Sequence, residues 1–257
     1  MTNPTGTPPS PVNSPQPEPG QADSHHANPV AGQVAGPVAK SATDSLIEPR
    51  RSYVTGTLSR EQLDANPMTQ FERWLGDARA EKLIDATAMM LSTVDPSGQP
   101  TSRVVLLKGI DERGFTFYTN HDSSKGLQLK TNPKAAVLFY WQKLERQVRI
   151  QGTVTQLPAA DADEYFYSRP EGSRFSAAAS AQSSPVANRS ELETAVASLK
   201  EQYPDGNVPR PANWGGYLLS PNYLEFWQGR DDRLHDRFIY ETAESPSTSW
   251  SVQRLSP

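Results

Sequence analysis

The architecture of this chain is set by one segment, Ala88-Met-Met-Leu-Ser-Thr-Val-Asp-Pro-Ser-Gly-Gln-Pro-Thr-Ser-Arg-Val-Val-Leu-Leu-Lys108. Two runs rich in β-forming residues, 88–94 and 101–108, flank Asp95-Pro-Ser-Gly98, whose glycine supplies the positive φ that a hairpin turn requires. The segment therefore predicts two antiparallel strands. A second such turn is Asp111-Glu-Arg-Gly114, and further β-type runs lie at 115–119, 135–141 and 147–155.

Helical patterns flank these strands. Asn66 and Pro67 are typical of an N-cap and a first helical residue, and the apolar spacing that follows predicts an amphipathic helix over about 67–84. We also predict helices at about 124–131, 161–168 and 190–202. Strands follow near 214–219, 223–227, 235–240 and 249–254, with Pro221 at one junction and a turn at 244–247 at another. Many short strands without β-α-β alternation predict a mainly β fold with flanking helices (α+β), closed as a barrel.

The first 40 residues contain nine prolines and no aromatic residue. Such a segment buries too little apolar area to offset its ordering entropy, so we expect residues 1–44 to form a disordered tail. The remaining residues, 45–257, are a size that one folded domain accommodates.

Composition excludes several classes of protein. The chain has 257 residues, 25 Lys and Arg against 29 Asp and Glu, and no cysteine, which rules out disulfide scaffolds and thiolate chemistry. A net charge of -4 without charge blocks indicates no nucleic-acid partner, and the longest apolar run, 135–141, is too short to span a bilayer. Only two histidines, His121 and His235, lie in the predicted domain, so we expect no metal site. We expect a soluble cytoplasmic protein that binds phosphate, if at all, through clustered cations.

Two segments carry local positive charge. Arg103 and Lys108 bound an apolar strand, and strand alternation predicts that they point to opposite faces; the alternative is an edge strand closed by protective charges. Ser123-Ser-Lys125 opens a helix, where backbone N–H groups and an ammonium favour phosphate, although an ordinary N-cap has the same pattern.

Three further segments bear groups suited to ligand recognition. Gln147 at a strand start could read the edge of a heterocycle, or belong to a solvated hairpin. Tyr165 and Arg169 lie four residues apart on a predicted helix that stops at Pro170, so both point toward the loop that holds Ser173. This arrangement predicts a binding site for a phosphate monoester; the alternative is a salt bridge from Arg169 to Glu171. The densest cluster spans 225–237 and contains Trp227, Arg233, His235 and Arg237, which either bind a ligand or neutralise nearby aspartates.

In this order the segments resemble the pyridoxamine 5′-phosphate oxidase family, from about Arg50 to Pro257. The resemblance is carried by Pro67-Met-Thr-Gln-Phe-Glu-Arg-Trp74, Arg103-Val-Val-Leu-Leu-Lys108, Phe117-Tyr-Thr-Asn120, Leu144-Glu-Arg-Gln-Val148, Tyr165-Phe-Tyr-Ser-Arg-Pro170, Gln182-Ser-Ser184, Trp214-Gly-Gly216, Glu225-Phe-Trp-Gln-Gly229, Arg233-Leu-His-Asp-Arg237 and Arg254-Leu-Ser-Pro257.

The resemblance implies an FMN-binding split β-barrel that works as a homodimer, with FMN in two clefts at the subunit interface. By resemblance, FMN would be held by Arg103, Val104, Val105, Leu106, Leu107, Lys108, Tyr118, Thr119, Lys125, Gln147, Gln182, Ser183, Trp227 and Arg237. The substrate would contact Arg50, Arg51, Ser52, Tyr53, Lys108, Tyr165, Arg169, Ser173, Arg233, Leu234 and His235, with Arg233 and His235 catalytic. The chain departs from the family at Ser124, where members often have arginine.

The implied reaction is oxidation of pyridoxamine or pyridoxine 5′-phosphate to pyridoxal 5′-phosphate, with dioxygen as acceptor and hydrogen peroxide as product. Three alternatives stay open at this point. A split-barrel reductase using an external hydride donor would lack the Tyr165 and Arg233 clusters, a binding protein would store FMN or pyridoxal 5′-phosphate without turnover, and a structural barrel would use the charges only for solubility.

Overall fold

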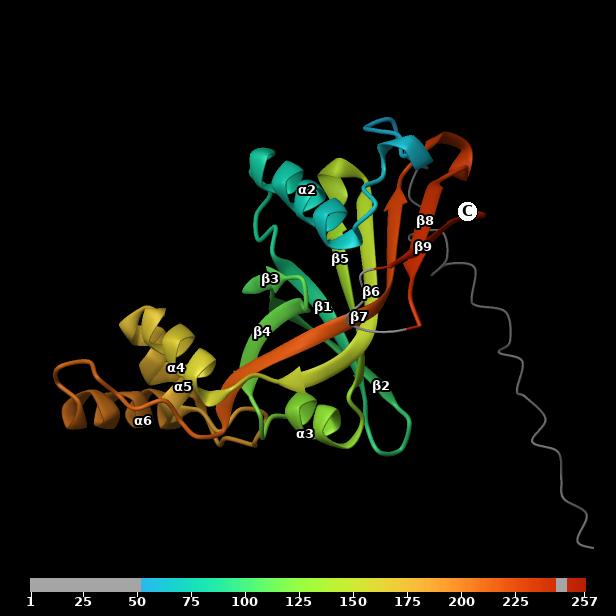
Figure 1. Cartoon of the computed structure of the whole chain (residues 1–257). Coiled ribbons are helices and arrows are strands. Elements are labelled where there is room, and N and C mark those ends of the chain that lie inside the picture. The colour runs from blue at the N-terminus through green and yellow to red at the C-terminus, as the bar shows by residue number, and fades with distance from the viewer. Residues whose placement is uncertain (1–51, 244–248) are drawn as a thin grey trace, which may run out of the picture. The chain divides into compact units, whose positions relative to one another are not determined.

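A nine-stranded antiparallel sheet is the centre of the structure, a computed structural model that describes residues 52–243 and 249–257. The strands are β1 (Ala88–Val94), β2 (Pro100–Leu106), β3 (Gly109–Asp111), β4 (Gly114–Asn120), β5 (Lys134–Trp141), β6 (Arg146–Gln156), β7 (Trp214–Gln228), β8 (Asp236–Glu241) and β9 (Ser251–Leu255). Their order is β2-β1-β5-β6-β7-β4-β3, and β8 pairs with both β7 and β9. The sheet curls into a half-barrel (Figure 1), which confirms the mainly β split-barrel prediction.

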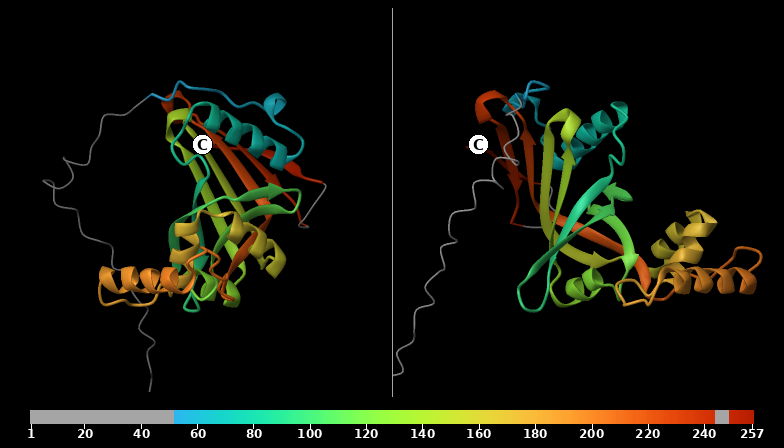
Figure 2. Two further views of the ribbon diagram at one scale, coloured as in Figure 1. Left: turned by 90° about the vertical axis from the view of Figure 1, so that its left-hand side faces the viewer. Right: turned by 180° about the vertical axis from the view of Figure 1, so that it is seen from behind.

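Five α-helices accompany the sheet in the described residues: α2 (Pro67–Ala80), α3 (Ser124–Thr131), α4 (Ala159–Ser168), α5 (Glu171–Ala179) and α6 (Arg189–Gln202). Three short 3-10 helices are η2 (Arg60–Gln62), η3 (Gln142–Leu144) and η4 (Asp231–Arg233). Helix α2 crosses one end of the sheet, while α4, α5 and α6 group at the other (Figure 2). None of the helices in these ranges has the length and apolar composition needed to cross a membrane.

The main core lies between α2 and the inner face of the sheet. Phe71 on α2 packs edge-on against Phe115 and Phe139, and Trp74 packs edge-on against Phe226. All five side chains are buried, so the amphipathic face of α2 that the sequence predicts is the face that closes the barrel. A second cluster joins α4 and α5 to the start of β7 through Phe166, Phe175, Val208 and Trp214.

Several elements differ from the sequence prediction. Helix α2 ends at Ala80 because Lys82 and Asp85 adopt positive φ. The predicted break at Pro221 is wrong: β7 runs through it, because a β-bulge shifts the β6 register between Gln151 and Gly152. Helix α5 was predicted as a loop; it forms where Phe175 is buried in the second cluster. The predicted 1–44 tail and the turn at 244–247 lie outside the described residues.

Candidate functional site

A cavity of about 1020 Å³ opens between β2, β4, the start of α3, and helices α4 and α5. It is lined by Arg103, Val104, Val105, Leu106, Lys108, Tyr118, Thr119, Asn120, Ser124, Lys125, Tyr165, Arg169, Pro170, Gly172, Ser173, Ser176, Ala177, Ser180, Gln182, Ser183 and Trp214. Four of these are basic and none is acidic, although the chain as a whole is acidic. The cavity is therefore a local site for an anion.

Lys125 provides a buried ammonium group at one wall. Its Nζ donates to Thr119 Oγ1 at 3.0 Å, to Ser123 Oγ at 3.1 Å and to Gln182 Oε1 at 3.4 Å. No carboxylate is among these partners, and burial together with the Arg103 charge lowers the pKa of Lys125 to about 8. Ser123 also caps α3 by accepting from the Gly126 N–H, so the helix start and the ammonium face the same space.

Arg103 is held by polar partners on two neighbouring elements. Its Nη1 donates to Thr93 Oγ1 on β1, and its Nη2 donates to Thr101 Oγ1 at 2.8 Å and Gln128 Oε1 on α3 at 3.3 Å. All of these acceptors are neutral, so the positive charge remains available to a ligand. Burial lowers the pKa of Arg103, as expected for a guanidinium that leaves water without a carboxylate.

The sequence predicts that Arg103 and Lys108 point to opposite faces of a strand. The structure places both residues in the lining of the cavity, Arg103 on β2 and Lys108 just beyond the end of β2 at Leu106. Val104, Val105 and Leu106 line the cavity as well. Leu107 differs from its neighbours, since its side chain is buried in the main core and is absent from the lining.

Another wall of the cavity is a stack of aromatic rings against which a further cation, Arg169, packs. The rings of Tyr118 and Tyr165 stack with centroids 3.9 Å apart, and Trp214 stacks on Tyr118 at 5.6 Å. The Arg169 guanidinium lies 4.9 Å from the centre of the Trp214 ring. Arg169 Nη1 is buried and has no hydrogen-bond partner among the described residues, so a ligand that accepts hydrogen bonds would satisfy it.

Two local details of this wall differ from prediction. Helix α4 ends at Ser168, and Arg169 caps it in an extended conformation instead of continuing the helix. Ser173 lies in the first turn of α5 and not in a loop. The predicted convergence is confirmed all the same, because Tyr165, Arg169 and Ser173 all line the cavity.

Gln182 and Ser183 reach the cavity from the segment after α5. Gln182 Oε1 accepts from Thr119 Oγ1 at 3.0 Å and from the Asn120 N–H at 3.3 Å, which ties this segment to β4. Ser183 adopts φ 74°, a conformation that a non-glycine residue rarely takes up. Backbone strain of this kind is concentrated at ligand sites.

A separate aromatic cluster lies on the outer face of the sheet, and its members do not line the cavity of this single chain. Gln147, Trp227 and Arg237 form one cross-strand row over β6, β7 and β8. The Trp227 and His235 rings lie 4.6 Å apart, and Tyr53 packs edge-on against both, at 5.9 and 5.5 Å. The predicted site residues therefore divide into two groups.

His235 has a defined proton position. Its Nδ1 accepts from the Arg230 N–H at 3.1 Å, so the neutral ring carries its proton on Nε2. Burial and the Arg233 charge lower the pKa of His235, while Asp236 opposes the shift. Arg233 and Leu234 are exposed, and Arg233 adopts φ 63° directly after Asp232 at φ 54°. Of the predicted N-terminal contacts, Ser52 is exposed, and Arg50 and Arg51 lie outside the described residues.

Sequence reasoning missed part of the cavity lining. The residues not predicted are Asn120, Ser124, Pro170, Gly172, Ser176, Ala177, Ser180 and Trp214. Three of the eight, Gly172, Ser176 and Ala177, are small residues on α5, a helix that the sequence does not predict. Trp214 had a signal, since Trp214-Gly-Gly216 is one of the segments that carry the resemblance; its ring also needs a flat partner, which Tyr118 supplies.

Comparisons with known proteins cover nearly all of the described chain. Residues 75–203 match the family described as pyridoxamine 5′-phosphate oxidase, and residues 214–257 match the pyridoxine 5′-phosphate oxidase C-terminal dimerisation region. A pyridoxine/pyridoxamine 5′-phosphate oxidase of Cupriavidus taiwanensis is 51% identical over 82% of this chain and 99% of its own. The enzyme of the same name from Bordetella pertussis is 50% identical, and the match covers 83% of this chain and 100% of that enzyme.

Solved structures agree with this assignment. PhzG from Burkholderia lata, in complex with tetrahydrophenazine-1-carboxylic acid, is 30% identical with a TM-score of 0.73, covering 78% of this chain and 98% of its own. A pyridoxamine 5′-phosphate oxidase-related, FMN-binding protein from Nostoc punctiforme has a TM-score of 0.61 at 20% identity, covering 76% and 100%, and supports the fold. From these matches and the predicted motifs together, the chain belongs to the pyridoxamine 5′-phosphate oxidase family.

Proposed function

We propose that this protein oxidises pyridoxamine and pyridoxine 5′-phosphate to pyridoxal 5′-phosphate, with FMN as cofactor and dioxygen as acceptor. The proposal rests on family membership and on relatives of about 50% identity that carry this activity in their names. The observation that supports it most directly is the cavity, where Arg103, Lys108, Lys125 and Arg169 gather without an acidic side chain. A phosphorylated cofactor and a phosphorylated substrate both require such a site.

The residues present fit the phosphate of FMN. Lys125 is buried with only neutral partners, Arg103 lies close enough to depress its pKa, and the capped start of α3 faces the same region. Ser124, which replaces a common family arginine, lines the cavity as a hydroxyl. Two cations and a helix N-terminus match the charge of a phosphate monoester.

Arg169 is suited to the substrate's phosphate. Its buried Nη1 has no partner among the described residues, and its guanidinium lies over the ring of Trp214. Tyr165, Ser173 and Lys108 line the same cavity and offer two hydroxyl groups and an ammonium. This donor set accepts several phosphate oxygens at once.

A second copy of the chain would complete the site. Met90, Val104, Leu106 and Tyr140 are exposed, Val104 to 66%, and cross-strand pairing puts them on one face of β2, β1 and β5. The same face continues across β5, β6, β7 and β8 to the row of Gln147, Trp227 and Arg237. A homodimer formed through this face would cover the apolar residues and bring one copy's row toward the other's cavity. The match to a dimerisation region supports this arrangement.

FMN, when bound, supplies the two-electron oxidation of the substrate's 4′ carbon, with dioxygen as final acceptor and hydrogen peroxide as product. The protein's own residues bind and orient. Holding the phosphate at Arg169 and the ring near His235 would fix the reacting carbon, and such positioning lowers the barrier without a nucleophile. Arg233 would position the substrate and stabilise developing charge, while His235 would donate a hydrogen bond from Nε2.

The deciding experiment uses the purified full-length protein, FMN and pyridoxamine 5′-phosphate in air. We expect hydrogen peroxide, ammonia and pyridoxal 5′-phosphate in equal amounts, and peroxide and pyridoxal 5′-phosphate without ammonia from pyridoxine 5′-phosphate. Binding of FMN without peroxide would indicate a storage protein, and turnover only with an added nicotinamide donor would indicate a reductase. Absence of FMN binding would reject the proposal at its first step.

A further inference from the structure

Glu225 is a buried carboxylate on the outer face of the sheet, away from the main hydrophobic core. Side chains alternate between the two faces along β7. Glu225 therefore shares a face with Tyr223 and Trp227, while Leu224 and Phe226 point to the core. Its side chain is nevertheless only 1% exposed. A charged group buried on this face requires partners that surround it.

Three side chains surround this carboxylate. Oε1 accepts from Arg237 Nε at 2.8 Å, and Oε2 accepts from Arg149 Nη1 at 3.1 Å and from the Tyr223 hydroxyl at 2.9 Å. Burial alone would raise the pKa of Glu225, but these hydrogen bonds and the two guanidinium charges hold it below its ordinary value. Glu225 is therefore charged at neutral pH and binds two arginines of adjacent strands.

Arg237 is restrained at two of its three nitrogens. Glu225 accepts from Nε, and the Ser256 carbonyl accepts from Nη1 at 2.8 Å. Nη2 has no hydrogen-bond partner in the ranges that the structure describes, and only about a quarter of the side chain is exposed. A free arginine loses rotamer entropy when a ligand immobilises it, whereas an arginine already held in place loses little.

We propose that Glu225 is a positioning residue for the cofactor: it aligns Arg237 so that the remaining guanidinium nitrogen can bind FMN. The inference rests on the proposed function, in which Arg237 and Trp227 contact FMN from one row of the sheet. Arg237 pairs across the strands with Trp227, and Glu225 lies two residues before Trp227 on the same face of β7, where its carboxylate accepts from Arg237 Nε and leaves Nη2 without a partner among the described residues.

The test is a double-mutant cycle on the full-length protein, with FMN removed and its dissociation constant measured by flavin fluorescence. Glu225→Gln should raise the FMN Kd roughly tenfold when Arg237 is present, equivalent to about 1.4 kcal/mol. In an Arg237→Gln background the same substitution should change Kd less than twofold. Glu225→Asp, which keeps the charge but shortens the side chain, repeats the cycle if Glu225→Gln does not fold.

Two control variants isolate the Arg237 bond. Tyr223→Phe and Arg149→Gln each remove another partner of Glu225, leave the Arg237 bond in place, and should leave FMN Kd within about twofold. The melting temperature of each cofactor-free protein identifies general destabilisation. Equal loss of FMN affinity in both Arg237 backgrounds, or no loss in either, would overturn the positioning role while wild-type FMN binding stands. Failure of the wild type to bind FMN would instead reject the proposed function.

Discussion

Trp227 and His235 lie with their ring centroids 4.6 Å apart, and Tyr53 packs edge-on against both rings. The contact joins β7 to the segment before β8 and gives His235 a fixed orientation. Because the Arg230 N–H occupies Nδ1, only Nε2 can donate a hydrogen bond to a substrate.

The first prediction concerns this proton. His235→Gln, whose amide can replace Nε2, should keep kcat/KM within about tenfold of wild type, whereas His235→Asn should lower it about 100-fold. The pKa of His235 is below its ordinary value of 6.5, so with saturating FMN wild-type kcat/KM should be flat above neutral pH and fall as acid protonates Nδ1. Steady-state rates across pH measure both effects. Equal activity of the two variants would contradict the Nε2 assignment.

Arg233 should act on turnover and not on cofactor binding. Its side chain is exposed close to His235, and its φ of 63° is a conformation that non-glycine residues rarely adopt. Arg233→Ala should therefore lower kcat/KM at least about tenfold, with FMN content unchanged. Arg113→Ala, at an exposed arginine paired with Asp111, is the control. Unchanged turnover would remove Arg233 from the site.

Arg169 should determine affinity for the substrate's phosphate. Loss of a charge-assisted hydrogen bond costs about 1.5–3 kcal/mol, so Arg169→Ala should raise KM for pyridoxamine 5′-phosphate roughly 10- to 100-fold with a smaller change in kcat. Arg189→Ala, at an exposed i,i+4 ion pair on α6, should leave KM unaltered. If Arg169→Ala keeps the wild-type KM, the phosphate lies elsewhere.

Lys125 should make FMN binding dependent on pH. Its pKa of about 8 means that the ammonium is present below this pH and is lost as pH rises through it. Above pH 8, binding of FMN then requires uptake of a proton, so Kd should rise with pH, by at most about tenfold per unit. Titrations at pH 7, 8 and 9 measure the slope. The Lys125→Met variant should bind FMN weakly, with a Kd that does not depend on pH in this range. The Lys134→Met variant, changed at an exposed lysine on β5, should keep the wild-type pH dependence of Kd.

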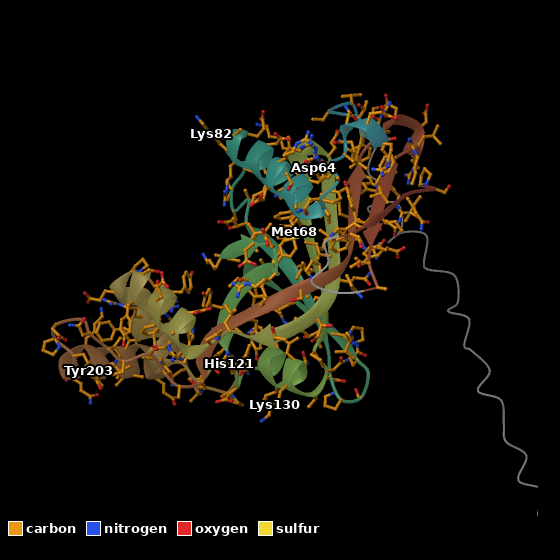
Figure 3. All side chains as sticks on the ribbon, in the orientation of Figure 1. Asp64, Met68, Lys82, His121, Lys130 and Tyr203 are labelled. Carbon is orange, nitrogen blue, oxygen red and sulfur yellow. The ribbon has the colours of Figure 1, made fainter. Side chains whose placement is uncertain are left out.

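Gly126 should be essential to the start of α3. A Cβ at this position would overlap the carbonyl oxygen of His121, which lies between β4 and α3 and is labelled in Figure 3. Gly126→Ala should therefore destabilise the fold by about 1–3 kcal/mol in urea unfolding at fixed protein concentration. Gly76→Ala, on α2 with open space around it, should stabilise by up to about 1 kcal/mol. Equal stability of both variants would show that the His121 turn can shift.

Much of the fold follows from local chemistry that the chain carries in its own order. Strand β1 and helix α3 have the predicted bounds, and β2, β4, β5 and β6 differ from prediction by no more than two residues at an end, whereas the short strand β3 is not predicted. The N-cap at Asn66 was predictable because its side chain accepts from an N–H only two residues away. Such signals depend on neighbours in sequence, so they are readable without coordinates.

The site was predictable mainly as a set of residues and less as an arrangement. Tyr165, Arg169 and Ser173 were expected to converge from helix spacing, and the cavity brings them together. The helix that carries Ser173 was not predictable, because α5 is stabilised by burial of Phe175 in the second core cluster, which comes from distant parts of the chain. The division between the cavity and the Trp227 cluster likewise depends on which strands pair.

By itself, the sequence determined the strand and turn pattern, the amphipathic face of α2 and the residue types available for an anion. Only the tertiary structure decided that β7 continues through Pro221, since its pairing with β6 runs on past a β-bulge in which Asn222 is the extra residue. It also decided that Arg103 and Lys108 line one cavity, since this depends on how β2 packs against the elements around it. Pairing and packing between distant segments set these features, and no local pattern encodes the partner.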